Sequence, residues 1–136
     1  MDRPLRILLV EDNPDDAEIT RFAAERTVSA QVTWISDGAS ALRALEGDLL
    51  HAGDRPDVIL LDMRLPGADG LEILRHVRQL SAYRETPVIV LTTVGDDEAT
   101  ILDCYESGAN SFLAKPATSQ RFAEALKVLA GAVVRA

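Results

Sequence analysis

Short apolar runs and segments with apolar residues at helical spacing alternate along the chain. The runs that end at Val10, Leu61 and Leu91 are almost free of polar residues, which is typical of strands buried on both faces of a sheet. A fourth run, at 31–36, has mixed polarity and predicts a strand at the edge of the sheet. Strands are therefore expected at 5–10, 31–36, 57–61, 88–91 and 110–114.

The segments that follow these runs predict helices. Asn13 is a suitable cap and Pro14 fits the first turn of a helix at 14–28, in which Ile19, Phe22 and Ala23 recur at helical spacing. A second helix is expected at 96–107, with Gly108 as its C-terminal stop. The other three helices are indicated by apolar residues at helical spacing: Ala41, Leu42, Leu45 and Leu49; Leu71, Leu74 and Val77; and Phe122, Leu126, Leu129 and Val133.

Five strand–helix units in succession predict an α/β fold, a doubly wound parallel sheet with helices on both faces. The length of 136 residues and an apolar content of 47% fit one domain over 1–136. The net charge of −8 and the absence of a Lys/Arg cluster argue against binding to nucleic acid or anionic membranes. Without an apolar stretch of about 20 residues or a signal peptide, we expect a cytoplasmic protein.

Polar residues follow four of the predicted strands directly. They are Glu11 and Asp12, then Asp62, then Thr92 and Thr93, and finally Lys115. Ligands of open parallel sheets bind outside the carboxyl ends of the strands, where the strand order reverses. We therefore expect these side chains to share one rim. Each residue taken alone has an ordinary explanation as a cap, a strand-end hydroxyl or a surface lysine, but the four strand ends together do not.

Three carboxylates on one rim repel each other, and a divalent cation removes the conflict. Mg²⁺ suits this case because it prefers oxygen and leaves coordination positions for water and phosphate. Asp62, the central acid, is the expected nucleophile for formation of an aspartyl phosphate. Lys115 and Thr92 are expected to bind phosphoryl oxygens.

These residues lie in motifs by which the chain resembles the receiver domain of two-component response regulators. The resemblance extends from the first strand to the last helix and implies a flavodoxin-like sheet of order 2-1-3-4-5. The motifs are Val10-Glu11-Asp12-Asn13, Leu60-Leu61-Asp62-Met63, Leu65-Pro66-Gly67 with Asp69-Gly70, Leu91-Thr92-Thr93, Gly108-Ala109 and Lys115-Pro116.

The resemblance also implies residue roles. A histidine kinase would phosphorylate Asp62. Mg²⁺ would bind Asp12, Asp62 and the backbone carbonyl of Arg64, with Glu11 acting through water. Thr92 and Phe112 would form a switch pair in which the ring turns inward on phosphorylation. The bond before Pro116 would be cis.

Within this family the chain is most similar to the single-domain regulators associated with bacterial phytochromes. The likeness lies in the segment 11–16, the long loop before Pro56, the Leu91-Thr92-Thr93 motif and the segment 108–111. It implies a light-sensing kinase as partner. The side chains of Arg64 and Thr93 depart from common receiver residues and bear on how long the phosphoryl group stays.

Output is expected to require a downstream protein, which the sequence does not name, because no second domain follows the last helix. The segment from Thr92 to Phe112, with a polar start at Gly95, is the expected two-state element. The apolar tail from Val128 is either a fraying terminus or part of a homodimer face that includes the last helix and the fifth strand. A phosphate sink and a phosphorelay intermediate are alternative roles.

Three rival functions fit the sequence less well. A phosphatase of the haloacid dehalogenase type needs an acid two residues after its nucleophile, where this chain has Arg64. A flavodoxin needs a first loop that tolerates phosphate without metal, whereas this loop is acidic. An interaction domain that works without phosphate would not need the acids, hydroxyl and lysine together.

Overall fold

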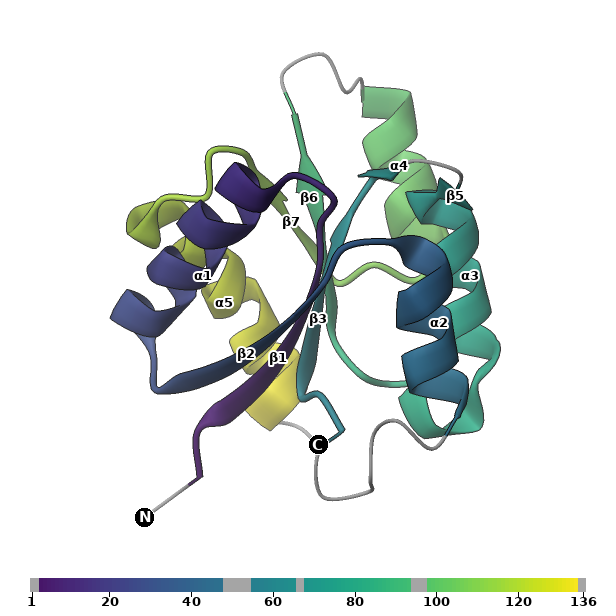
Figure 1. The fold of residues 1–136 in the computed structure, drawn as a ribbon, viewed down its shortest axis with the longest axis horizontal. Coiled ribbons are helices and arrows are strands. Elements are labelled where there is room, and N and C mark those ends of the chain that lie inside the picture. Colours follow the sequence, from purple (N-terminus) through teal and green to yellow (C-terminus); the bar gives the residue numbers. More distant parts are fainter. Residues whose placement is uncertain (1–2, 48–54, 66–67, 94–97, 135–136) are drawn as a thin grey trace.

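The computed structural model describes residues 3–47, 55–65, 68–93 and 98–134, and gives only the backbone at 68 and 130–134. Strands and helices alternate along the described chain (Figure 1). Each predicted helix and strand is present, and the elements for which bounds were predicted have described ends within two residues of those bounds. The elements are β1 (Leu5–Val10), α1 (Pro14–Thr27), β2 (Ala30–Ile35), α2 (Gly38–Glu46), β3 (Val58–Asp62), β4 (Arg64–Leu65), β5 (Ala68–Asp69), α3 (Gly70–Gln79), the 3-10 turn η2 (Ser81–Tyr83), β6 (Val88–Thr92), α4 (Glu98–Glu106), β7 (Ser111–Ala114) and α5 (Ser119–Val134).

Five strands form one parallel sheet in the order β2-β1-β3-β6-β7. Numbered along the chain among themselves, these strands have the predicted order 2-1-3-4-5. The two-residue strands β4 and β5 pair with each other in a separate antiparallel hairpin, which the sequence did not predict because two residues carry no periodicity. Asp62 pairs with Leu91, and Thr92 pairs with Ala114, so the carboxyl ends of β3, β6 and β7 reach the same level.

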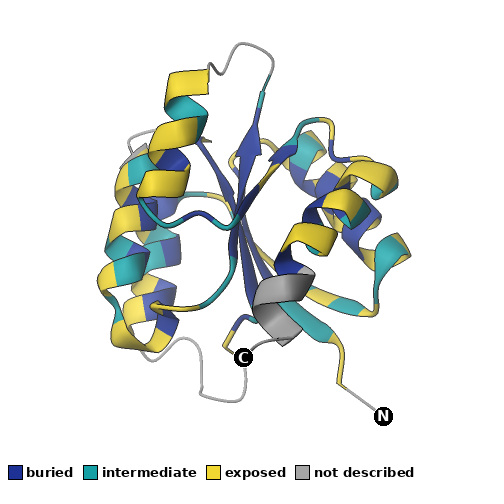
Figure 2. Ribbon diagram, turned by 180° about the vertical axis from the view of Figure 1, so that it is seen from behind, coloured by how far each residue is buried: buried dark blue, intermediate teal, exposed yellow. Residues whose placement is uncertain are grey.

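Helices cover both faces of the sheet. Helices α1 and α5 lie on one face, and α2, α3 and α4 lie on the other (Figure 1). Two apolar clusters fill the layers, one on each face. The central strands are buried along their length (Figure 2), whereas β2 is only partly buried, as its predicted edge position requires.

Helix α1 packs differently from its predicted apolar pattern. The side chains of Ile19 and Phe22 are 43% and 58% exposed, and the guanidinium of Arg26 lies over the Phe22 ring. The buried side of α1 is instead made of small residues: Ala17, Thr20, Ala23 and Ala24. Small side chains let the helix lie close to the sheet, so the larger ones are left in solvent.

A clamp around Arg78 fixes the end of α4. Gly108 has a φ of 114°, a left-handed conformation that favours glycine, and α4 ends just before it, as predicted. The Arg78 guanidinium donates hydrogen bonds to the carbonyl of Gly108 and to the side-chain oxygen of Asn110. It also donates to the carbonyls of Tyr83 and Thr86, so α3, η2 and the loop before β7 are joined.

Some predicted features lie outside the described residues. They are Leu49, the part of the long loop before Pro56 at 48–54, Pro66 and Gly67, the start of the two-state element at Gly95, and the side chain of Val133. None of the described helices has the length and apolar character needed to cross a membrane.

Candidate functional site

Three carboxylates meet at the carboxyl ends of β1 and β3. Glu11 and Asp12 follow β1, and Asp62 is the last residue of β3. Each offers an oxygen atom within 4.8 Å of the others. Glu11 and Asp62 are buried, whereas Asp12 is exposed. The strands are parallel neighbours, so their carboxyl ends coincide and bring together acids that lie about fifty residues apart.

Lys115 reaches this cluster from the end of β7. Its Nζ lies 3.0 Å from Glu11 Oε1 and 3.0 Å from Asp62 Oδ2. A third carboxylate, that of Asp16 in the first turn of α1, lies 3.3 Å away. The backbone amide of Lys115 donates to the Thr92 carbonyl at 2.8 Å, which fixes the chain beside β6. The Lys115–Pro116 bond is cis, the isomer that the resemblance implies.

The proton affinities of Glu11 and Lys115 follow from this packing. Burial and the neighbouring Asp62 carboxyl raise the pKa of Glu11 to about 7, although Lys115 opposes the shift. Burial alone would lower the pKa of Lys115, but its hydrogen bonds to Glu11 and Asp62 outweigh burial and raise that pKa above its ordinary value. The lysine therefore stays charged, while Glu11 carries a proton for part of the neutral pH range.

The backbone around Asp62 is tightly packed. The side-chain Oδ1 of Asp62 accepts a hydrogen bond from the Arg64 backbone amide at 3.0 Å. The first residue of α3 is Gly70, and a Cβ added there would lie 2.7 Å from both the Asp62 carbonyl oxygen and the Met63 Cα. Glycine thus lets α3 start directly against the end of β3, which holds the Asp62 backbone in place.

The two residues predicted to act as a switch lie on adjacent strands. Thr92 ends β6 and is buried, next to Ala114 in β7. Phe112 is 43% exposed and contacts the Tyr105 ring edge-to-face at a centroid distance of 6.4 Å. The ring therefore points outward. The roles of Thr92, Phe112 and the Arg64 carbonyl stay predictions.

Two residues at the site were not predicted from the sequence as parts of it. Asp16 lies in the first turn of α1, where a negative charge is favourable for the helix dipole, and its contact with Lys115 depends on how α1 packs. Trp34 in β2 donates its indole N–H to the Glu11 carbonyl at 2.7 Å. No sequence motif predicted either contact.

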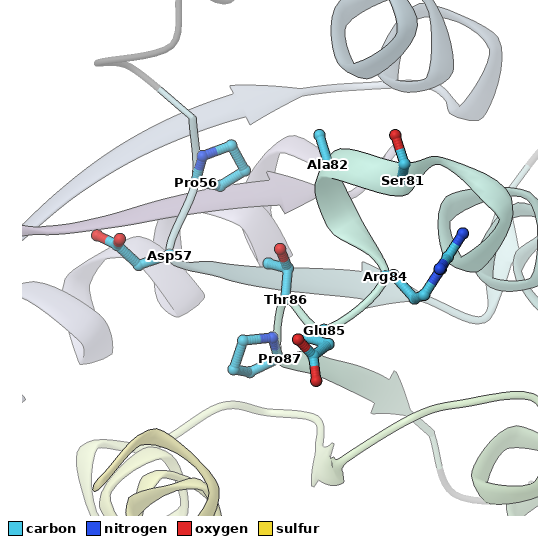
Figure 3. Close-up of a pocket in the computed structure, with 8 residues that line it drawn as sticks. All are labelled: Pro56, Asp57, Ser81, Ala82, Arg84, Glu85, Thr86 and Pro87. Carbon is cyan, nitrogen blue, oxygen red and sulfur yellow. The ribbon is translucent and has the colours of Figure 1, made fainter. Parts of the chain in front are cut away.

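A separate hollow of about 410 Å³ lies at the amino ends of β3 and β6 (Figure 3). The Asp57 and Arg84 side chains on its wall point to opposite sides. Asp57 is already bound by the Arg3 guanidinium at 2.8 and 2.9 Å. Because these charged groups do not converge, the hollow lacks the arrangement found at the acidic cluster.

The family model of the response regulator receiver domain matches residues 7–127. The probable methanogenesis regulatory protein FilR2 of Methanothrix harundinacea is 39% identical over 117 residues, or 83% of this chain and 73% of FilR2. The chain also matches longer transcriptional regulatory proteins and spans only 42% of CseB of Streptomyces coelicolor and 51% of PhoB of Escherichia coli.

Solved structures with the same fold include two regulators whose names link them to phytochromes and a third that was solved with Mn²⁺ bound. The bacteriophytochrome response regulator RtBRR is 39% identical, with a TM-score of 0.80 over 93% of this chain and 78% of that one. The phosphorylated cyanobacterial phytochrome response regulator RcpA is 32% identical, with a TM-score of 0.78 over 98% and 97%. The Mn²⁺-bound form of response regulator Rcp1 is 30% identical, with a TM-score of 0.74 over 93% of this chain and 91% of that one. A response regulator named Rcp1 is also among the similar proteins, from Synechocystis sp..

Proposed function

Because this chain belongs to the response regulator receiver domain family, we propose that it accepts a phosphoryl group on Asp62 from the phosphohistidine of a sensor histidine kinase. The observation that carries the proposal is the position of Asp62. Its carboxylate is buried, lies 3.0 Å from the Lys115 ammonium, and is within 4.8 Å of the Glu11 and Asp12 oxygens. A buried acid in these surroundings offers a nucleophilic oxygen, and the Lys115 ammonium beside it can pair with the negative charge of a transferred phosphoryl group.

The same residues fit a magnesium ion. Glu11, Asp12 and Asp62 supply a set of hard oxygen donors, and the raised pKa of Glu11 reflects repulsion and burial that a cation would relieve. Asp12 and Asp62 would hold the ion directly, with the Arg64 carbonyl as a further ligand and Glu11 acting through water. When bound, Mg²⁺ supplies positive charge for the phosphoryl oxygens. The Mn²⁺-bound form of Rcp1, which has the same fold, supports this assignment.

The proposed transfer is a nucleophilic displacement at phosphorus. A carboxylate oxygen of Asp62 forms the new O–P bond while the P–N bond to the kinase histidine breaks. The electron pair leaves with the imidazole, which takes up a proton from water. Lys115 and the Thr92 hydroxyl stabilise the charge on the equatorial oxygens. Hydrolysis later returns the Asp62 carboxylate and inorganic phosphate, so the chain acts as an acceptor and not as a catalyst of a separate substrate.

Acetyl phosphate and Mg²⁺ provide the direct test, with the intact mass of the protein as the readout. We expect the gain of one phosphoryl group, lost on chelation of the metal and lost in Asp62→Asn. Asp57→Asn is the matched control, because Asp57 is also a strand-adjacent acid but is bound to Arg3 at the opposite end of the sheet. A phosphoryl group that persists in Asp62→Asn, or repeated turnover of an aryl phosphate, contradicts the proposal.

The partner kinase has to approach the rim on which α1 begins. Ile19 and Phe22 present an exposed apolar surface on α1, which also places Asp16 beside Lys115. We assign this surface to the kinase. The names of RtBRR and RcpA support a bacterial phytochrome as the source of the phosphoryl group.

Phosphotransfer from a purified bacterial phytochrome kinase tests both assignments. Phe22→Ala should slow transfer from the kinase about tenfold, the loss expected for one apolar anchor, and leave phosphorylation by acetyl phosphate unchanged. Leu102→Ala on α4, which removes a similarly exposed apolar side chain, serves as the control. Equal transfer rates in the two variants argue against the α1 surface, and transfer that is independent of light argues against a phytochrome partner.

The output surface is proposed to lie around Phe112. Its ring, Tyr105 and Val128 border a hollow of about 300 Å³ between α4, β7 and α5, which also holds Arg121 and Glu124. These two residues carry opposite charges, and a two-fold axis can bring each one to its counterpart in a second copy of the chain. Movement of Thr92 toward the phosphoryl group and of the Phe112 ring inward would reshape this surface.

Sedimentation with and without beryllofluoride, a phosphoryl mimic, tests dimerisation through β7 and α5. We expect dimerisation to increase with the mimic, Arg121→Glu to weaken it, and the double variant Arg121→Glu with Glu124→Arg to restore it. A chain that stays monomeric at high concentration in both states contradicts the dimer. In that case the downstream partner is a different protein, or the chain serves as a phosphate sink or relay intermediate.

A further inference from the structure

All three N–H donors of the Lys115 ammonium have carboxylate acceptors in the structure. An ammonium group carries three N–H donors, and three carboxylates accept from Nζ: Glu11 at 3.0 Å, Asp62 at 3.0 Å and Asp16 at 3.3 Å. A phosphoryl oxygen that binds Lys115 must therefore displace or share one of these acceptors. The identity of that acceptor follows from the surroundings of each carboxylate.

Glu11 is poorly suited to release the lysine. It is fully buried, and its second oxygen accepts a hydrogen bond from the Asn13 amide at 3.2 Å. A buried carboxylate has no water to replace a lost lysine contact, so losing that contact is costly whenever the carboxylate is charged. Asp62 stays beside Lys115 after the transfer, because the phosphoryl group is attached to it and the remaining carbonyl oxygen of the acyl phosphate can still accept the N–H.

Asp16 differs from both of the other acceptors. Its side chain is 35% exposed, whereas that of Lys115 is 11% exposed, so water can replace the ammonium around its carboxylate. It also makes the longest of the three contacts and is not one of the acids grouped around the candidate metal position. Its ion pair is therefore the least costly of the three to break.

We propose that Asp16 is a positioning residue that holds Lys115 in the resting protein and gives up that contact to the phosphoryl group. The inference rests on the proposed acceptance of phosphate at Asp62. It assigns Asp16 an inhibitory role: its negative charge competes with the phosphoryl oxygens for the same N–H donor. The strength of this contact then sets how readily the protein is phosphorylated and how tightly it retains a phosphoryl mimic.

The contact itself can be tested without metal or phosphate. The chain has only two lysines, Lys115 and Lys127, so the side-chain ¹⁵Nζ spectrum contains two signals, with the exposed Lys127 as an internal reference. We expect Asp16→Asn to shift the Lys115 signal and speed exchange of its N–H protons. Asp15→Asn removes a charge from the same helical turn, and Asp15 is not among the acids that pair with Lys115 in the described part of the chain. This variant should leave that signal in place.

The functional consequence is measured as the rate of phosphorylation by acetyl phosphate and the affinity for beryllofluoride, both with saturating Mg²⁺. Asp16→Asn should raise both by about two- to fivefold relative to Asp15→Asn, the size expected of one partly exposed ion pair. Comparing the two variants cancels the general effect of removing one negative charge near an anionic donor. Asp16→Glu, which keeps the charge, should stay closer to the wild type than Asp16→Asn.

Distinct results would overturn this inference or the function on which it rests. Equal rates in Asp15→Asn and Asp16→Asn, or slower phosphorylation of Asp16→Asn, refute competition by Asp16 even if Asp62 is phosphorylated normally. An unchanged Lys115 signal in Asp16→Asn refutes the resting contact. Failure of the wild-type protein to gain a phosphoryl group, with the Lys115 signal still sensitive to Asp16, refutes the function and leaves the contact intact.

Discussion

Magnesium binding should release a proton from Glu11, so the affinity for the metal should depend on pH. Burial, together with the Asp62 carboxyl, raises the pKa of Glu11 from 4.5 to about 7. A divalent cation beside this carboxyl favours its charged form. In the metal-free protein below about pH 7, the ion must therefore displace a proton before Glu11 can contribute charge or a water-mediated contact.

The magnitude follows from linkage of one proton to one metal ion. With a pKa of about 7, the apparent affinity should fall by nearly tenfold per pH unit well below that value, or about 50-fold between pH 7 and pH 5, and change less than twofold from pH 7 to pH 8. The raised pKa of Glu11 also predicts that the folding stability of the metal-free protein falls as pH rises. The folded state binds this proton more tightly than the unfolded chain, so the metal-free protein loses up to about 3 kcal/mol as pH rises from about 4.5 through about 7.

Trp34 provides the assay, because it is the only tryptophan and its indole donates to the Glu11 carbonyl. Titration with Mg²⁺ followed by its fluorescence gives the affinity at each pH. Calorimetry in two buffers of different ionisation enthalpy counts the protons released, close to one near pH 6 and close to none near pH 8.5. Glu11→Gln should remove most of the pH dependence. Equal affinity at pH 6 and pH 8, or an undiminished slope in Glu11→Gln, would refute the reasoning.

Three substitutions test the packing that supports the site. Gly70→Ala places a Cβ 2.7 Å from backbone atoms of the β3 end, and should cost about 1–3 kcal/mol in urea unfolding and slow phosphorylation; an unchanged midpoint contradicts the close packing. Arg78→Ala leaves the carbonyls of the clamp without their hydrogen-bond donor and should lower the free energy of unfolding by about 2–4 kcal/mol. It should also speed hydrogen exchange of the Asn110 amide, and protection equal to wild type would argue against the clamp. The thiol of Cys104 lies 3.3 Å from the Met63 sulfur in a buried contact, so Cys104→Ser should lower stability by about 1–3 kcal/mol, measured as the urea midpoint, and a stabilised variant would contradict this.

The main elements of the fold and the residues of the site were predictable for a local reason. Apolar runs that end at Val10, Leu61 and Leu91 can be buried on both faces only as central strands, and the helices between them force these strands to be parallel. Parallel strands place their carboxyl ends on one rim. For this reason, Glu11, Asp62 and Lys115 could be grouped from the sequence although they lie far apart along it.

Some predictions failed because helical spacing says which residues share a face but not which face is buried. Ile19 and Phe22 share a side of α1, yet the helix turns its small residues inward to lie close to the sheet. The hairpin of β4 and β5 was missed because a two-residue strand has no pattern to detect. The resting position of the Phe112 ring was not among the predictions, and it involves a contact with Tyr105 in another element.

The succession of strands and helices and the identity of the acids, hydroxyl and lysine at the rim are therefore properties of the chain as written, whereas the order of the strands in the sheet was implied by the family resemblance. They follow from local patterns of burial and from the geometry that all parallel sheets share. The three-way contact of Lys115 and the distinction between Asp15 and Asp16 are not local properties. They depend on the exact distance and rotation at which α1 packs against α5 and the sheet. That packing is set by small side chains in contact across elements that lie far apart in the sequence.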